Sequence, residues 1–201
     1  MDRLSVVRAI LLGVGLCACD DSAADSGTTR AVGRVDAIRA NTKKSQLADL
    51  CDVAPEPAQD FTWPELDKTP AAQTGSRYRW VNVWATWCKP CVEELPLLAR
   101  SFATWQQQKH PVTLTLVSVD ADTTAPEQFL AAHRDWAGVP PNSALKDPSA
   151  ANTWLASTGL ASGSAIPVHL ILDAHDKLLC ARSGGISAQD LERFQRALFA
   201  P

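Results

Sequence analysis

The chain has 201 residues, of which 46% are hydrophobic, and this is enough for one domain with a core and an N-terminal extension. Its formal net charge is −3 and no basic stripe runs along it, which argues against nucleic acid as a partner. Beyond the first 20 residues, no apolar run is long enough to cross a bilayer.

The first residues have the pattern of an export signal. A basic start is followed by small apolar residues over 9–18, a run too short for an ordinary membrane-spanning helix. Leu16-Cys17-Ala18-Cys19 resembles a bacterial lipoprotein signal, which implies a signal peptide over 1–18 and a lipid on Cys19. In such lipoproteins, an acidic residue at the position of Asp20 often marks retention at the inner membrane. The alternative is an ordinary secretory signal with an incidental Cys19.

Residues 19–60 have the composition of a tether. The first part is rich in Asp, Ser, Thr, Gly and Ala and shows no apolar periodicity, as is typical of linkers. A short helix is predicted near residues 45–50, and Pro55 and Pro57 then interrupt the chain. We therefore interpret 19–60 as a lipid-anchored tether and N-terminal extension, and we place the start of the folded domain at Phe61.

Hydrophobic periodicity over 61–201 predicts one domain in which strands and helices alternate. Strands are predicted over 77–85, 112–119, 168–172 and 177–181, with 61–63 as a further short strand or packed segment. Helices are predicted from 90 or 92 to 108 and over 126–136, 148–157 and 187–199, with a loop over 138–142. The order β-α-β-α-α-β-β-α joins a parallel βαβ half to an antiparallel ββα half. We therefore expect an α/β fold with a central mixed sheet flanked by helices.

Two cysteines separated by two residues follow the strand predicted over 77–85. Cys88 and Cys91 lie at the start of a predicted helix, and Pro90 suits its first turn. The unpaired N–H groups and the dipole of a helix N-terminus stabilise a thiolate, which lowers the pKa of a thiol there. We expect Cys88 to attack a substrate disulfide and Cys91 to resolve the mixed disulfide. Lys89 adds a nearby positive charge, and Trp87 would form one wall of the site.

The sequence resembles the thioredoxin superfamily, and most closely the membrane-anchored, extracytoplasmic thiol-disulfide oxidoreductases of the TlpA/ResA type. The likeness covers about residues 61–199 and is carried by the segments 81–91, 93–96 and 166–173. It implies a thioredoxin fold and a cis peptide bond before Pro167 that lies against the dithiol. It also implies that Ile166 and Pro167 contact an extended substrate peptide. By base rate alone, a trans proline at the start of a strand would be favoured.

The sequence departs from cytoplasmic thioredoxins at Asn82, where a buried aspartate often helps to move the proton of the second cysteine. Asparagine cannot titrate. Four carboxylates could serve instead, namely Asp120, Asp122, Glu93 and Glu94. For each one singly, the plainer interpretation is a loop cap or a solvated acid in the first helical turn.

Cys51 and Cys180 remain as an even pair. In an oxidising compartment, such a pair predicts a structural disulfide that ties the N-terminal segment to the last strand. The alternatives are two free thiols, or Cys180 as a small buried apolar residue.

The histidines do not predict a metal site. His110, His133, His169 and His175 have no ligand spacing with the dithiol, and a second close cysteine pair is missing. By analogy with thioredoxin-fold metallochaperones, copper delivery would use Cys88, Cys91 and His169. The sequence therefore predicts no metal ligands and no cofactor, with copper delivery as an alternative.

These features predict a thiol-disulfide oxidoreductase that reduces a disulfide of an envelope protein through Cys88 and Cys91. Disulfide oxidase or isomerase activity is the alternative within the same chemistry. The resemblance implies an electron donor in the membrane and attachment to the periplasmic side of the inner membrane through the N-terminal lipid. It also suggests cytochrome c maturation, with apocytochrome thiols as the substrate, or maturation of a copper-site protein.

Overall fold

The computed structural model describes Ala37 and residues 46–70, 74–134, 136 and 138–199. The chain divides into two compact units, Met1–Ile38 and Arg39–Pro201, and every described residue except Ala37 belongs to the second. Within these described residues, no helix is both long and apolar enough to span a bilayer. The predicted signal peptide and Cys19 lie outside the described residues.

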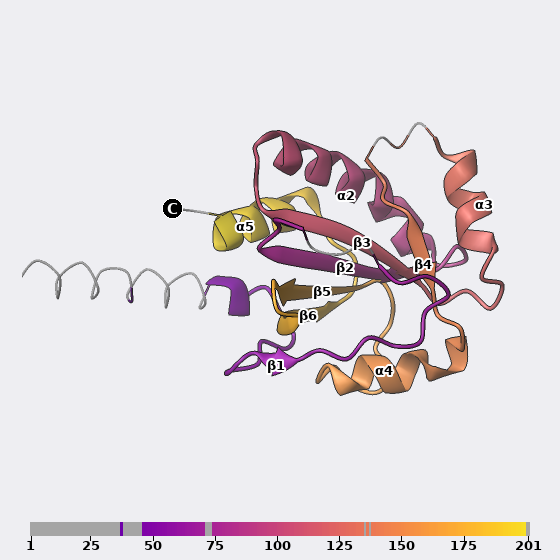
Figure 1. The fold of residues 1–201 in the computed structure, drawn as a ribbon, viewed down its shortest axis with the longest axis horizontal. Coiled ribbons are helices and arrows are strands. Elements are labelled where there is room, and N and C mark those ends of the chain that lie inside the picture. The colour runs from indigo at the N-terminus through magenta and orange to yellow at the C-terminus, as the bar shows by residue number, and fades with distance from the viewer. Residues whose placement is uncertain (1–36, 38–45, 71–73, 135, 137, 200–201) are drawn as a thin grey trace, which may run out of the picture. The chain divides into compact units, whose positions relative to one another are not determined.

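A six-stranded sheet in the order β1-β6-β5-β2-β3-β4 forms the centre of the second unit (Figure 1). Its strands are β1 (Gln59–Asp60), β2 (Tyr78–Trp84), β3 (Val112–Ser118), β4 (Asn142–Ala144), β5 (Val168–Asp173) and β6 (Lys177–Ser183). The strands β2, β3 and β4 are parallel, whereas β5, β6 and β1 continue the sheet by antiparallel pairing. The predicted mixed sheet is therefore confirmed.

Helices cover both faces of this sheet (Figure 1). They are α2 (Lys89–Gln107), α3 (Ala125–Ala132), α4 (Ala151–Ser157), which follows the short 3-10 helix η1 (Pro148–Ala150), and α5 (Ala188–Phe199). Apolar residues of α2 and α5 share one core cluster with Trp80 and Trp84 of β2. Residues of α4 share a second cluster with Val81 and Val83. Because successive side chains of β2 point to opposite faces, this one strand contributes to both cores.

The strand β4 lies at the end of the region predicted to be a loop. It has only three residues, and asparagine and serine are not strand formers, so its sequence carries no strand signal. Tertiary contacts hold it in place instead. The indole N–H of Trp84 donates to Oδ1 of Asn142 at 2.9 Å, and Nδ2 of Asn142 donates to Oγ of Ser118 at 3.0 Å. These buried hydrogen bonds join three strands beside the turn that leads to the cysteines.

Two helices also begin or end differently from the predictions. The helix α3 ends at Ala132 rather than Trp136, and Nδ1 of His133 lies 2.8 Å from the carbonyl oxygen of Phe129. The helix predicted over 148–157 is a 3-10 turn that continues into α4. Such boundaries depend on terminal side-chain contacts, which apolar periodicity does not report.

Residues before Phe61 already pack on the sheet. Leu47 and Leu50 are buried in the same core cluster as the dithiol, and Val53 forms a β-bridge with Ala181. The strand β1 then pairs antiparallel with β6. The packed part of the chain therefore begins before the boundary expected from the sequence. Sequence analysis did not predict these contacts, because Pro55 and Pro57 interrupt the pattern of this stretch.

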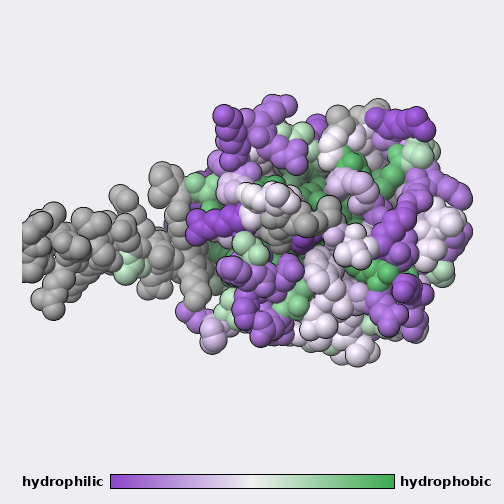
Figure 2. Space-filling model, viewed as in Figure 1, coloured by the Kyte–Doolittle hydropathy of each residue, from purple (hydrophilic) through white to green (hydrophobic). Residues whose placement is uncertain are grey.

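On the face shown in Figure 2, polar side chains predominate, with small apolar areas between them. Among the described residues, Trp87 is the large hydrophobic side chain that stands out as exposed, at 68%. It lies directly before Cys88, so the exposed aromatic ring belongs to the segment that carries the cysteines.

Candidate redox site

The two cysteines of the short motif lie where β2 passes into α2. Cys88 is the N-cap residue of α2, and its sulfur accepts a hydrogen bond from the backbone N–H of Cys91 at 3.3 Å. The two residues are joined by a disulfide with a Cα–Cα distance of 5.3 Å. A sulfur at this position receives an N–H group of the first helical turn, which would stabilise it as a thiolate.

A groove gives access to one of the two sulfurs. Cys91 is fully buried, whereas Cys88 is 5% exposed and lines a groove of about 540 Å³. The described lining residues are Trp87, Cys88, Lys89, Pro90, Val119, Pro148, Ala151, Asn152, Leu155, Ser164, Ala165 and Ile166. Most of them are apolar, and Lys89 is the charged residue among them. The groove therefore suits an apolar peptide segment that presents its sulfur to Cys88.

The peptide bond between Ile166 and Pro167 is cis, which confirms the predicted conformation. Sγ of Cys88 lies 3.7 Å from the carbonyl oxygen of Ile166, so this bond is placed against the dithiol. The carbonyl oxygen of Pro167 accepts the N–H of Gly184 at 2.8 Å, which ties this loop to the end of β6. Ile166 lines the groove, and Pro167 is buried behind it.

The other residues of the motif lie at the rim. Trp87 and Pro90 are exposed and line the groove beside Cys88. The side chain of Lys89 is 85% exposed, and its Nζ lies 3.7 Å from Oε1 of Glu93 one turn along α2. An exposed pair of this kind contributes little to stability, because water screens both charges. The charge of Lys89 therefore acts on the sulfurs mainly through solvent.

Asp120 and Asp122, two of the candidate proton carriers, hold backbone segments in place through their carboxylates. The buried carboxylate of Asp120 accepts the backbone N–H of Thr86 at 3.1 Å and its hydroxyl at 2.6 Å. Asp122 is an exposed loop cap, and hydrogen bonds from the hydroxyl and the backbone N–H of Thr124 lower its pKa. Asp120 thus fixes the turn before Cys88, and Asp122 fixes the loop before α3.

We expect Asp120→Asn and Asp122→Asn to leave the pH dependence of disulfide exchange unchanged, because both carboxylates hold turns. Asp120→Asn should still cost about 1–3 kcal/mol of stability, since a buried hydrogen bond to a charged group is weakened. Asp122→Asn, at an exposed loop, serves as the matched control. Stopped-flow rates between acidic and alkaline pH, together with thermal unfolding, check both expectations. A shift of the pH profile in either variant would show that the replaced carboxylate takes part in proton transfer.

Glu94 is the candidate carboxylate that the fold buries beneath the dithiol. It lies one turn beyond Cys91 on α2 and is 5% exposed, whereas Glu93 is exposed. Its Oε1 accepts Nδ2–H of Asn82 at 2.9 Å, and its Oε2 accepts the backbone N–H of Ile186 at 2.9 Å. The position shares the helical face of Cys91, a signal that spacing along the sequence does contain. The structure thus separates two adjacent glutamates that composition could not distinguish.

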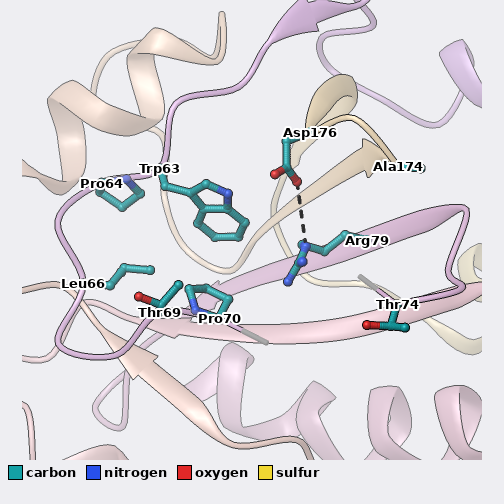
Figure 3. Close-up of a pocket in the computed structure, with 9 residues that line it drawn as sticks. All are labelled: Trp63, Pro64, Leu66, Thr69, Pro70, Thr74, Arg79, Ala174 and Asp176. Atoms are coloured by element: carbon teal, nitrogen blue, oxygen red, sulfur yellow. Dashed lines mark ion pairs between the residues drawn. The ribbon is translucent and has the colours of Figure 1, made fainter. Parts of the chain in front are cut away.

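A larger cavity, of about 720 Å³, lies away from the dithiol (Figure 3). Arg79 at the start of β2 lies within it, whereas Cys88 follows the other end of that strand. The guanidinium of Arg79 lies 5.5 Å from the ring centre of Trp63, and its Nε lies 3.9 Å from Oδ1 of Asp176. Burial lowers the pKa of Arg79, and the carboxylate of Asp176 opposes this shift. These contacts hold the segment around Trp63 onto the sheet.

The described residues contain no group of three His, Cys, Asp or Glu side chains that could hold a metal ion. His169 is buried against Trp80 and Glu94. His110 stacks on Phe199. The structure therefore adds no third ligand to the two cysteines from its described histidines.

No protein-family model matches the chain, and no curated protein matches it significantly. Solved structures do resemble it. A protein of Bacteroides vulgatus assigned as a thiol-disulfide oxidoreductase has a TM-score of 0.53 and 19% identity, over 73% of this chain and 97% of that one. A thiol:disulfide interchange protein of the thioredoxin family from Chlorobium tepidum has a TM-score of 0.51 and 21% identity, over 73% and 96%. The chain therefore has the predicted thioredoxin fold.

Proposed function

We propose that the protein is a thiol-disulfide oxidoreductase whose dithiol is formed by Cys88 and Cys91. The observation that carries this proposal is a disulfide at a helix N-terminus, with one sulfur open to an apolar groove. The N–H of Cys91 directed at the sulfur of Cys88 favours the thiolate, which is the attacking form. The buried Cys91 is shielded from solvent, as a resolving cysteine should be.

In the reducing direction, the Cys88 thiolate attacks one sulfur of a substrate disulfide. A Cys88–substrate disulfide forms, and the other substrate sulfur leaves as a thiolate. Cys91 then loses its proton and attacks Cys88, so that the Cys88–Cys91 disulfide forms and the second substrate sulfur is released. Two electrons pass to the substrate in total. The exposed ring of Trp87 and the backbone at Ile166 would hold the substrate peptide in the groove.

The proton of Cys91 needs an acceptor within the protein because Cys91 is fully buried. We infer that Glu94 takes it, since this carboxylate is buried on the same helix one turn further along. Asn82, at the position expected of an acidic residue, instead donates a hydrogen bond to Glu94. The proposed proton acceptor therefore lies on the helix α2, and not on the strand β2.

We infer that electrons flow toward the substrate. No histidine lies between the cysteines, where Lys89 and Pro90 stand, and a dithiol without such extra stabilisation of its thiolate is not a strong oxidant. A membrane protein would then supply electrons to the oxidised form. Oxidase or isomerase activity is the alternative, and the reduction potential separates it from reduction.

We also propose that Cys19 carries a lipid and holds the domain at the periplasmic side of the inner membrane, with residues 1–18 removed. The apolar run that stops at Cys19 supports this proposal. A domain held there would act on proteins of the envelope, and apocytochromes with their thiols are one such class of substrate. Mass spectrometry of envelope extracts tests it, because an unmodified Cys19 would refute the anchor.

Reduction of a protein disulfide in dithiothreitol tests the proposed activity. We expect the full chain to accelerate the precipitation of insulin B chain, with dithiothreitol as the source of electrons. A rate equal to that of the protein-free control would refute the proposal. Copper delivery would instead give stoichiometric Cu(I) binding with slow exchange, and the described residues offer no third ligand in its favour.

A further inference from the structure

A buried histidine connects the dithiol helix to the centre of the sheet. His169 on β5 lies directly opposite Asn82 of β2, and its side chain is 1% exposed. Its Nδ1 accepts the indole N–H of Trp80 at 3.1 Å. Its Nε2 lies 3.4 Å from Oε1 of Glu94. A buried imidazole that contacts the inferred proton acceptor has no part in the mechanism described so far.

Trp80 determines which nitrogen of His169 carries a hydrogen. An indole nitrogen can only donate, so Nδ1 must act as the acceptor and the hydrogen of the neutral ring lies on Nε2. A protonated ring would place a second N–H against the indole N–H. The contact with Trp80 thus leaves Nε2 as the nitrogen that faces Glu94, at 3.4 Å from Oε1.

The groups that face Glu94 come from three parts of the chain, and all of them present an N–H group. They are the side-chain amide of Asn82 on β2, the imidazole of His169 on β5 and the backbone N–H of Ile186 after β6. His169 is the titratable group among these contacts; on α2 itself, Cys91 lies three residues before Glu94 and the exposed Glu93 lies next to it. Asn82 and Ile186 donate hydrogen bonds to Glu94, whereas Nε2 of His169 contacts Oε1 at 3.4 Å without forming a hydrogen bond.

We propose that His169 is a positioning residue for the resolving step, an inference that rests on the proposed function. Its Nε2–H, held in place by Trp80, lies against the Glu94 carboxylate and keeps that carboxylate oriented to accept the proton of Cys91. The Cys91 thiolate then attacks Cys88, the Cys88–substrate bond breaks, and the electron pair leaves on the substrate sulfur. The proton on Glu94 passes to solvent before the next turnover. Without the imidazole of His169, Glu94 loses its contact on the β5 side and accepts the proton of Cys91 less readily.

A chromogenic disulfide, dithiobis(nitrobenzoate), separates the two steps in the reduced full chain. Attack by Cys88 releases the first coloured thiolate, and attack by Cys91 on the mixed disulfide releases the second. For His169→Leu, we expect an unchanged first phase and a second phase whose half-maximal pH rises by about one unit, equivalent to about tenfold slower resolution on the acidic limb. His169→Gln, which keeps a neutral donor, should restore the profile.

Trp80→Phe should shift the second phase in the same direction as His169→Leu, because it removes the N–H that fixes the imidazole. His175→Leu, at an exposed histidine in the turn between β5 and β6, is the matched control and should behave as the unsubstituted protein. A folded His169→Leu with an unshifted second phase would overturn the proposal. If that variant does not fold, Trp80→Phe decides, and an unshifted second phase again overturns it. Absence of a second thiolate from the unsubstituted protein would refute the proposed function itself.

Discussion

Replacing Cys88 with serine is expected to reduce the rate of protein-disulfide reduction by about a thousandfold or more, to that of the protein-free control. A serine hydroxyl is not ionised at neutral pH, so the N–H groups at the start of α2 have no thiolate to stabilise. The groove would then present no nucleophile to the substrate. The insulin assay with dithiothreitol measures this loss.

Cys91→Ser is the informative partner of this variant. It keeps the attacking sulfur but lacks the resolving one, so the first step proceeds and the mixed disulfide accumulates. Mass spectrometry should find one substrate molecule on Cys88 and no turnover. The opposite assignment, with Cys91 as the attacking residue, would show the adduct in Cys88→Ser instead. That result would contradict the assignment of Cys91 as the resolving cysteine, which rests on its burial.

The second large effect is expected from the disulfide between Cys51 and Cys180, which the structure contains as predicted. The bond joins residues 129 positions apart and attaches the segment before β1 to β6. Removing it should cost about 2–5 kcal/mol of unfolding free energy, because the unfolded chain gains freedom. We expect Cys51→Ala to lower Tm by roughly 5–15 °C in calorimetry.

The matched variants separate the bond from the packing of each cysteine. Cys180 is fully buried on β6, whereas Cys51 is half-buried, so Cys51→Ala is the cleaner measure. The double variant should cost no more than a few tenths of a kcal/mol beyond Cys180→Ala, since either change alone breaks the same bond. Costs that add fully would show that packing, and not the disulfide, stabilises this region. Below its Tm, the double variant should also keep full disulfide reduction, which makes it the control for Cys88→Ser.

The central features of the fold follow from local patterns in the sequence. The apolar run of β2 and the spacing of Cys88, Pro90 and Cys91 place a dithiol at the start of a helix, and the structure has this arrangement. The cis bond before Pro167 was expected from a family resemblance and not from any local property of the residue. Its contact with Cys88 depends on a pairing across 78 positions of the chain.

The features that sequence analysis missed depend on tertiary contacts. The strand β4 has no strand formers, and the buried amide of Asn142 holds it through Trp84 and Ser118. Sequence analysis named Glu93 and Glu94 together, although the spacing of Glu94 from Cys91 places it on the buried face of α2, and packing against β2 and β5 shows that Glu94 is the buried one. The same packing brings His169 to Glu94, a contact that no spacing along the chain predicts.

The reduction potential of the Cys88–Cys91 couple tests the central proposal most directly. Equilibration of the full chain with dithiothreitol and glutathione buffers, followed by a thiol count, gives this value. We predict a reducing potential of about −270 mV, as expected of a dithiol that passes electrons to protein disulfides. A potential of about −120 mV would contradict the proposed direction and would indicate an enzyme that introduces disulfides.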